Sequence, residues 1–159
     1  PVVFVCENNF YSVYTHIKDR QPKGRKLFKL AQAIGAKSSK LNQDNPYKLF
    51  MKFKNIFYKV RKNPYPHFIE IETYRYLEHC GPNDDTHLGY RTDKELKHWK
   101  KKDPLIFSRD FLIKKNLLNK SKINLIDKKI KNSVDIEFNS IKNLKKPNFS
   151  KIKELVYKK

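Results

Sequence analysis

The chain begins with PVVFVCENNFY (residues 1–11), an apolar run that stops abruptly at polar residues. Residues 1–6 are rich in valine and do not alternate with polar side chains. This pattern is typical of a strand that is buried on both faces of a parallel sheet. Glu7, Asn8 and Asn9 then end the run. We therefore predict that the chain opens with a buried parallel strand.

Helices and strands are predicted to alternate after this strand. Residues 25–34 place apolar side chains on one helical stripe, with Gly35 as a candidate C-terminal cap. A short strand is expected near residues 36–41. A second helix should open at residues 44–46, where Asp-Asn-Pro supplies a capping side chain and a first-turn proline, and should end at Pro64.

The next segment completes the pattern of a parallel sheet. Residues 67–74 alternate apolar and polar side chains and are predicted to form another strand. The order strand, helix, strand, helix, strand indicates an α/β fold, with a parallel sheet flanked by helices and right-handed crossovers. Residues 75–91 form a long polar loop, and loops of this length in a compact domain are usually functional or disordered.

Helices are predicted for the rest of the chain. Thr92 and Glu95 have the spacing of a capping box, which opens the first of them. Asp103 precedes Pro104 and should cap the next. Residues 123–141 carry apolar side chains at three- and four-residue steps, which predicts a final amphipathic helix. We therefore expect C-terminal helices after the α/β part.

Length and composition limit the class of protein. A chain of 159 residues fits one domain with a real core. Cys6 and Cys80 lack the spacing of a disulfide framework or a zinc site. No apolar run is long enough for a membrane helix. We expect a cytoplasmic protein that does not span a membrane. A strand directly after Pro1 is an unusual beginning, so we also expect a fragment whose N-terminal part lies upstream.

The net charge of +20 raises the alternative of a basic nucleic-acid-binding module. Against this alternative, only six of the 36 basic residues are arginine, and no nucleic-acid-binding motif is recognisable. The lysine clusters are also not interleaved with the aromatic side chains that stack on bases. We therefore interpret the charge as a solvated lysine surface and expect no nucleic-acid partner.

Three sequence blocks stand in a recognisable order. They are VCENNFY (residues 5–11), ETYR (residues 72–75) with His79, and GYR (residues 89–91) leading through Glu95 to KDP (residues 102–104). Together they resemble the alpha subunit of the thiamine-diphosphate-dependent, decarboxylating component of 2-oxo acid dehydrogenase complexes, of the pyruvate dehydrogenase type. Residues 147–157 resemble that family's closing segment. The resemblance implies a C-terminal part of the subunit, with the N-terminal part missing.

The family's cofactor motif starts with Gly-Asp-Gly and ends at an Asn-Asn pair on the next strand. Only the second half is present, so the resemblance makes the Asn9 side chain and the Tyr11 backbone carbonyl ligands of Mg²⁺. Hard divalent cations prefer such oxygen ligands. The aspartate ligand would lie upstream of Pro1. The alternative for Asn8 and Asn9 is a simple turn pair, because asparagine bonds readily to its own backbone.

The loop histidine of the family corresponds to His79, which would lie beside the cofactor's diphosphate and act in catalysis. Arg75 is expected to anchor the loop rather than touch substrate. Asp84 or Asp85, with Tyr90 and Arg91, would hold the loop's far end.

Two neighbours of His79 depart from the family. Glu78 stands where glycine is common, and Cys80 stands where serine is common. Phosphorylation of that serine therefore cannot regulate this protein. A carboxylate at Glu78 would also bring negative charge close to a diphosphate.

The resemblance implies oxidative decarboxylation of a 2-oxo acid, pyruvate foremost, with thiamine diphosphate and Mg²⁺ as cofactors and acyl transfer to a lipoyl group. Implied partners are the beta subunit, in an α₂β₂ assembly, and the lipoyl-bearing acyltransferase. Acetoin or another carbonyl compound is the alternative substrate. Residues 1–91 would be the C-terminal half of the diphosphate-binding domain, and residues 92–159 its helical extension. The fragment alone is expected to be inactive.

Overall fold

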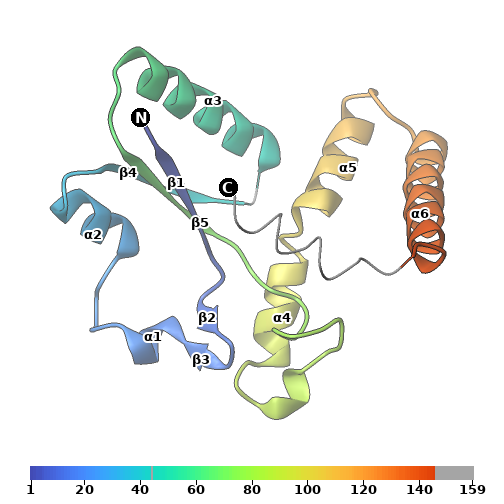
Figure 1. Ribbon diagram of the computed structural model, residues 1–159, viewed down its shortest axis with the longest axis horizontal. Helices are drawn as coiled ribbons and strands as arrows, with labels where there is room; N and C mark the ends of the chain where they lie inside the picture. Colours follow the sequence, from blue (N-terminus) through green and yellow to red (C-terminus); the bar gives the residue numbers. More distant parts are fainter. Residues whose placement is uncertain (44, 146–159) are drawn as a thin grey trace. The chain divides into compact units, whose positions relative to one another are not determined.

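The computed structural model describes residues 1–43 and 45–145 (Figure 1). The chain divides into two compact units, Pro1–Phe111 and a second unit that begins at Leu112. The first unit contains a three-stranded sheet and the helices that pack on it. Within the described residues, no helix combines the length and the apolar character that crossing a bilayer requires.

The sheet of the first unit is parallel, with the strand order β1-β5-β4. Its strands are β1 (Val3–Asn8), β4 (Lys37–Asn42) and β5 (His67–Glu72). The register pairs Asn8 and Asn42 with Glu72, so all three strands end at the same level. Figure 1 shows β5 between its two neighbours. The predicted α/β class with a parallel sheet flanked by helices is confirmed.

The prediction that the opening strand is buried on both faces is wrong for the described residues. Phe4 is 54% exposed and Val5 is 47% exposed. The strand that is buried is β5, whose Ile69 is fully buried. The reason is position in the sheet, because β1 occupies an edge and pairs with β5 alone. An apolar run shows that a strand can be buried on both faces, but it does not supply the segments that cover it.

Two helices cover opposite faces of the sheet. The helix α3 (Pro46–Lys62) packs Ile56 and Val60 into the core with the isoleucines of β5. The helix α2 (Leu27–Ala33) contacts β4 and β5, and its backbone meets Glu70, whose side chain points to the other face because strand side chains alternate. Both crossover helices therefore lie where the predicted alternation of elements requires.

The caps of these helices follow from the sequence. The Asn45 side chain accepts a hydrogen bond from the Lys48 N–H at 3.0 Å, and Pro46 occupies the first turn. Gly35 follows α2 with φ of +91°, a conformation that glycine adopts without strain. Asp44, the first residue of the predicted capping segment, lies outside the described residues.

Short elements surround the carboxyl end of the sheet. A hairpin of β2 (Tyr11–Ser12) and β3 (Thr15–His16) leads into α1 (Ile17–Arg20). After β5, the predicted long loop contains the 3₁₀ helix η1 (Thr86–Leu88). The helices α4 (Asp93–Lys100) and α5 (Pro104–Lys114) follow.

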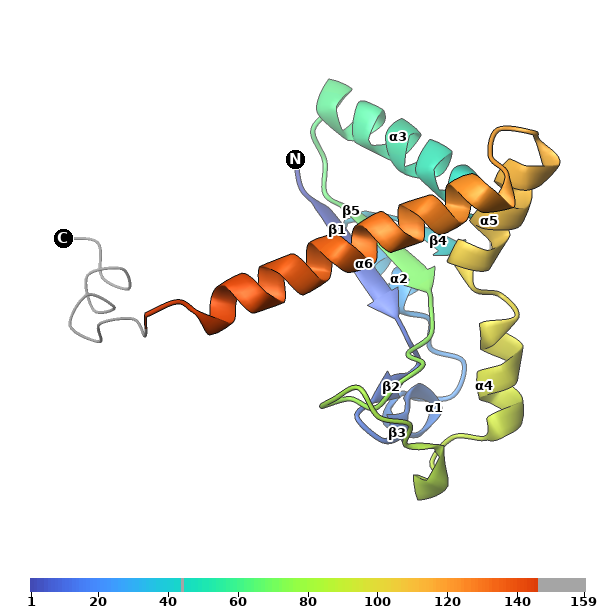
Figure 2. The same ribbon diagram turned by 90° about the vertical axis from the view of Figure 1, so that its right-hand side faces the viewer.

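The second unit is described as far as residue 145 and consists mainly of α6 (Lys120–Lys142), drawn as one long helix in Figure 2. Asn119 caps it by accepting the Lys122 N–H at 2.9 Å. The predicted apolar stripe is present, but no α6 residue is buried, and Ile130 is 58% exposed. Residues 147–157, the segment that resembles the family's ending, lie outside the described residues.

Candidate functional site

The predicted Mg²⁺ ligands lie in a turn at the carboxyl end of β1. The Asn8 Oδ1 atom accepts the Phe10 N–H at 3.0 Å, and the Asn9 Oδ1 atom accepts the Tyr11 N–H at 3.0 Å. Phe10 has a φ of 69°, in the left-handed region. The asparagine pair therefore forms two overlapping turns. An amide oxygen has two acceptor sites, so the Asn9 oxygen can hold the turn and still offer a lone pair to a cation.

The Tyr11 side chain ties this turn to α4. Its hydroxyl donates a hydrogen bond to the Glu95 carboxylate at 2.8 Å, and its ring meets Tyr74 and Tyr90 edge-on. Burial and the bond to Glu95 raise the pKa of the Tyr11 hydroxyl well above its usual value. The hydroxyl therefore keeps its proton and donates it to Glu95. Tyr11 is held by this bond and by the bond from its N–H to Asn9.

The role of Glu95 differs in part from the sequence prediction. The Thr92 hydroxyl accepts the Glu95 N–H at 3.1 Å, which is one half of the predicted capping box. The carboxylate binds Tyr11 instead of returning to the helix end. Partners 84 residues apart cannot be read from local spacing, and so the sequence prediction missed this contact.

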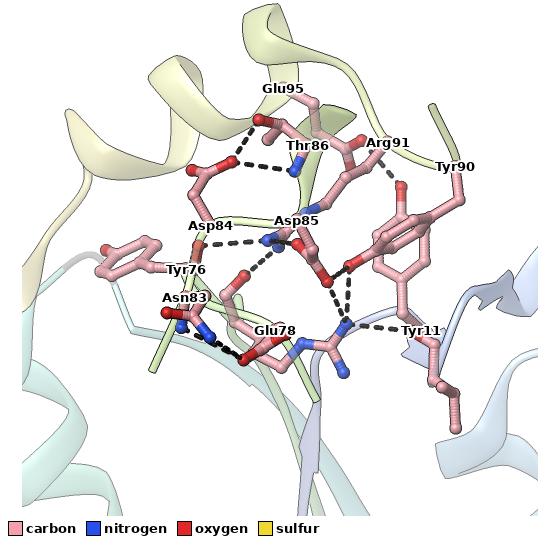
Figure 3. A network of polar contacts seen from close by, with 12 residues as sticks. Tyr11, Tyr76, Glu78, Asn83, Asp84, Asp85, Thr86, Tyr90, Arg91 and Glu95 are labelled. Carbon is pink, nitrogen blue, oxygen red and sulfur yellow. Dashed lines mark hydrogen bonds and ion pairs between the residues drawn. The ribbon is translucent and has the colours of Figure 1, made fainter. Parts of the chain in front are cut away.

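A buried ion pair holds the far end of the long loop, as Figure 3 shows. The Asp85 side chain is 2% exposed and pairs with the Arg91 guanidinium, which is also buried. Arg91 donates further hydrogen bonds to the backbone carbonyls of Arg75 and Tyr76. The prediction that Asp85 and Arg91 fix this end of the loop is confirmed, because one guanidinium joins both of its ends.

Tyr90 and Arg75 extend this network to the hairpin. The Tyr90 hydroxyl donates to the second Asp85 oxygen at 2.6 Å. The Arg75 guanidinium donates to the Tyr90 hydroxyl at 2.8 Å and to the Val13 carbonyl at 2.9 Å. Arg75 therefore anchors the loop, as predicted. Asp84 is exposed and only accepts bonds from Thr86.

The tip of the loop is closed by contacts between its own residues. The Glu78 carboxylate accepts the Asn83 Nδ2–H at 2.8 Å, and the Glu78 N–H donates to the Asn83 carbonyl at 2.9 Å. A Cβ atom at Gly81 would lie 2.3 Å from the Glu78 Oε1 atom, so a side chain there would displace the Glu78 carboxylate from its present position. The carboxylate that replaces the family's glycine is thus engaged inside the loop (Figure 3).

His79 is exposed on this tip. In residues 1–43 and 45–145, no hydrogen bond or ring contact joins it to Asn9 or Tyr11. The structure therefore brings two of the three predicted site residues together and leaves the third on a loop that is anchored at residues 75 and 91.

A positively charged cavity of about 610 Å³ opens beside the turn. The turn contributes Asn8 and Phe10 to its wall, and α2 contributes Phe28. Its basic lining residues are Lys18, Lys23, Arg25, Lys26 and Lys40. Of these, Lys40 pairs with Glu72 at 2.6 Å. The wall also includes the carboxylates of Glu70 and Glu72, so its five basic side chains outnumber two acidic ones. This excess of positive charge favours anions.

The Asn9 amide oxygen and the Tyr11 carbonyl oxygen suit Mg²⁺ as ligands, but they are only part of the set that the cation needs. An amide oxygen and a backbone carbonyl are the hard ligands this cation takes, and it requires six. Among the described residues, no cluster of three His, Cys, Asp or Glu side chains could hold a metal ion. Asn9 and Tyr11 can therefore complete a metal site but cannot form one without further ligands.

Comparisons with known proteins identify the family to which the chain is similar. The sequence model of the family described as "Dehydrogenase E1 component" matches residues 1–150. The chain is 29% identical to the pyruvate dehydrogenase E1 component subunit alpha of Staphylococcus aureus (strain Mu50 / ATCC 700699), over 99% of the chain and 42% of that protein. It is 28% identical to the subunit of the same name from Rickettsia bellii (strain RML369-C), over 99% of the chain and 47% of that protein.

The chain spans less than half the length of these relatives. The family match nevertheless covers both units of the structure, from the first strand to beyond α6. The chain belongs to the dehydrogenase E1 component family.

Proposed function

We propose that this chain is the alpha-subunit portion of a thiamine-diphosphate-dependent 2-oxo acid dehydrogenase that acts on pyruvate. The turn at the end of β1 carries this proposal, because it holds Asn9 and Tyr11 at the carboxyl edge of a parallel sheet, where α/β proteins bind their ligands. The names of the relatives favour pyruvate over acetoin. The basic cavity beside the turn suits an anionic substrate.

In this proposal, the Asn9 side-chain oxygen and the Tyr11 carbonyl hold Mg²⁺, through which the diphosphate binds. His79 donates a charge-assisted hydrogen bond to the diphosphate from the loop. The Asp85–Arg91 pair keeps that loop beside the site. Bound thiamine diphosphate supplies the electron sink for decarboxylation.

The proposal includes partners. The remaining contacts to the cofactor would come from the rest of the alpha subunit and from a beta subunit in an α₂β₂ assembly, and a lipoyl-bearing acyltransferase would accept the acyl group. Residues 1–91 would form the C-terminal half of the diphosphate-binding domain, and residues 92–159 its helical extension. Cys6 and Cys80 are free thiols, which suits the cytoplasm that we propose for this protein.

The complete alpha subunit with its beta subunit is expected to bind thiamine diphosphate only when Mg²⁺ is present and to decarboxylate pyruvate. Residues 1–159 alone are expected to give no calorimetric signal when titrated with thiamine diphosphate and Mg²⁺, because two oxygen ligands cannot complete the coordination shell of the cation. Circular dichroism serves as the control that this chain is folded. Tight binding by the folded chain alone would contradict the proposal that the rest of the alpha subunit and the beta subunit supply the remaining contacts to the cofactor.

The His79→Ala substitution in the complete α₂β₂ protein is expected to weaken cofactor binding about 10-fold or more, since a hydrogen bond to a charged group contributes roughly 1.5–3 kcal/mol. Stability should stay within about 0.5 kcal/mol, because the side chain is exposed. The matched control is His87→Ala, also an exposed loop histidine. Equal cofactor affinity in the two variants would remove His79 from the site.

A further inference from the structure

Glu70 is a buried carboxylate in the middle strand of the sheet, and its side chain is on the face opposite to the isoleucine core. Glu70 is 5% exposed. One carboxylate oxygen accepts the Asn8 Nδ2–H at 2.8 Å, and the other accepts the Phe28 N–H at the start of α2 at 3.1 Å. A buried charge is costly unless hydrogen bonds satisfy it, and both of these oxygens have a donor. This side chain therefore joins β1, β5 and α2.

The bond from Asn8 to Glu70 decides how the asparagine amide is oriented. An ionised carboxylate only accepts hydrogen bonds, so the amide nitrogen of Asn8 must face Glu70. The amide oxygen is then directed to the Phe10 N–H, which it accepts at 3.0 Å. Reversal of the amide would place its oxygen against the carboxylate and leave the Phe10 N–H without this acceptor.

Phe10 needs that acceptor because its backbone lies in the left-handed region, with φ of 69°. The conformation costs a bulky residue free energy and persists only where neighbouring contacts hold it. The Ile17 N–H gives a second contact, to the Phe10 carbonyl at 2.7 Å. Phe10 stands between Asn9 and Tyr11, so its conformation sets the angle at which their oxygens are presented.

We propose that Glu70 is a positioning residue for the divalent cation: it orients Asn8, and Asn8 holds the turn that presents Asn9 and Tyr11. This inference rests on the proposed function. Glu70 itself touches neither cation nor cofactor. Its effect passes through two hydrogen bonds, Glu70 to Asn8 and Asn8 to Phe10.

The first test is Glu70→Gln in the complete α₂β₂ protein. The introduced amide has one acceptor oxygen where two donors converge, so either Asn8 or Phe28 meets an N–H instead of an oxygen. Loss of such a supporting contact typically weakens metal binding roughly 10- to 100-fold. The probe is Mn²⁺, titrated in the presence of thiamine diphosphate and followed by electron paramagnetic resonance. When the cation is saturating, the KM of Glu70→Gln for pyruvate should equal that of the wild-type protein.

The matched control is Glu72→Gln. Glu72 lies two residues further along β5, on the same face. Its backbone is the register partner of Asn8, but its carboxylate pairs with Lys40 and not with the Asn8 side chain. Its substitution removes the same charge from the same strand, so the affinity for Mn²⁺ is expected to stay within about twofold of wild type. A loss equal to that of Glu70→Gln would show a general charge effect and contradict the inference.

The decisive test exchanges the two partners in a double variant, Asn8→Asp with Glu70→Gln. The introduced amide then donates to the introduced carboxylate, which still accepts the Phe10 N–H, while the amide oxygen accepts the Phe28 N–H. All three hydrogen bonds of the wild-type arrangement then have a counterpart, and the total charge is unchanged. The double variant is expected to regain most of the Mn²⁺ affinity lost in Glu70→Gln.

The outcomes separate this inference from the proposed function. If Asn9→Ala abolishes cation binding while Glu70→Gln leaves it within twofold of wild type, the inference is wrong and the proposed function stands. If Asn9→Ala also leaves binding intact, the proposed function is wrong. If Glu70→Gln cannot be purified, the double variant decides: recovered affinity supports the inference, and lost affinity or failure to fold contradicts it.

Discussion

Replacing Asn9 with alanine is expected to abolish Mg²⁺-dependent binding of thiamine diphosphate by the complete α₂β₂ protein. The substitution removes the proposed amide ligand. It also removes the acceptor of the Tyr11 N–H, so the neighbouring carbonyl ligand loses its support. Because loss of a supporting contact alone weakens metal binding roughly 10- to 100-fold, loss of a ligand together with its support should exceed that range. Calorimetric titration of the cofactor at fixed Mg²⁺ measures the effect.

The matched control for this variant is Asn42→Ala. Asn42 ends β4 at the same level as Asn8 ends β1, but it is exposed and outside the turn. Asn9→Asp is the conservative variant, because the carboxylate keeps an oxygen for both the turn and the cation. It should retain cofactor binding. Near-normal affinity of Asn9→Ala would remove the main assignment of the site.

The second large effect is expected from Asp85→Ala, which leaves the Arg91 charge buried without its partner. Breaking a buried ion pair from one side typically costs about 3–5 kcal/mol of stability. Chemical unfolding of residues 1–159, followed by the fluorescence of the single tryptophan, measures the loss. Trp99 is a suitable reporter because its ring stacks on Tyr74, 5.4 Å between centroids.

Asp84→Ala is the control for this substitution, because Asp84 is exposed and is not part of the buried pair. It should leave the free energy of unfolding close to the wild-type value. A cost for Asp85→Ala no larger than that of Asp84→Ala would show that the Asp85–Arg91 pair does not hold the loop.

The dependence of this effect on pH follows from the pKa of Asp85. Burial alone would raise the pKa of this carboxyl, but hydrogen bonds from Tyr90 and Arg91 and the charges of Arg91 and Arg75 outweigh it and lower the pKa. A pKa that is lower in the folded state contributes stability above the unfolded value near 4, and this contribution is lost as pH falls through the folded value. The difference in free energy of unfolding between wild type and Asp85→Ala, measured by the same unfolding experiment, should therefore shrink only under acidic conditions.

Local sequence signals predicted the local structure well. Asn45 and Pro46 set the start of α3, Thr92 caps α4, and apolar patterns placed β1 and β5. The hairpin of β2 and β3 was missed because strands of two residues are too short to show an alternating pattern. The burial of β1 was predicted wrongly, since burial depends on what covers a strand.

The candidate site shows the same limit. The resemblance to the family pointed to the turn, in which a hydrogen bond joins Asn9 and Tyr11. Neither the bond from Glu70 to Asn8 nor that from Tyr11 to Glu95 is visible in the sequence, because each joins residues more than 60 positions apart. Such contacts depend on strand order and helix placement, which only the folded chain supplies.

The loop after β5 has a base that is fixed to the rest of the first unit and a tip whose hydrogen bonds are made between its own residues. The base depends on Asp85 and Arg91, and the tip on Glu78 and Asn83. Within the described residues, the hydrogen bonds of the tip and those of the base share no residue. A substitution at the tip, for example at Cys80 beside the histidine, should therefore leave the contacts that anchor the loop to the hairpin in place.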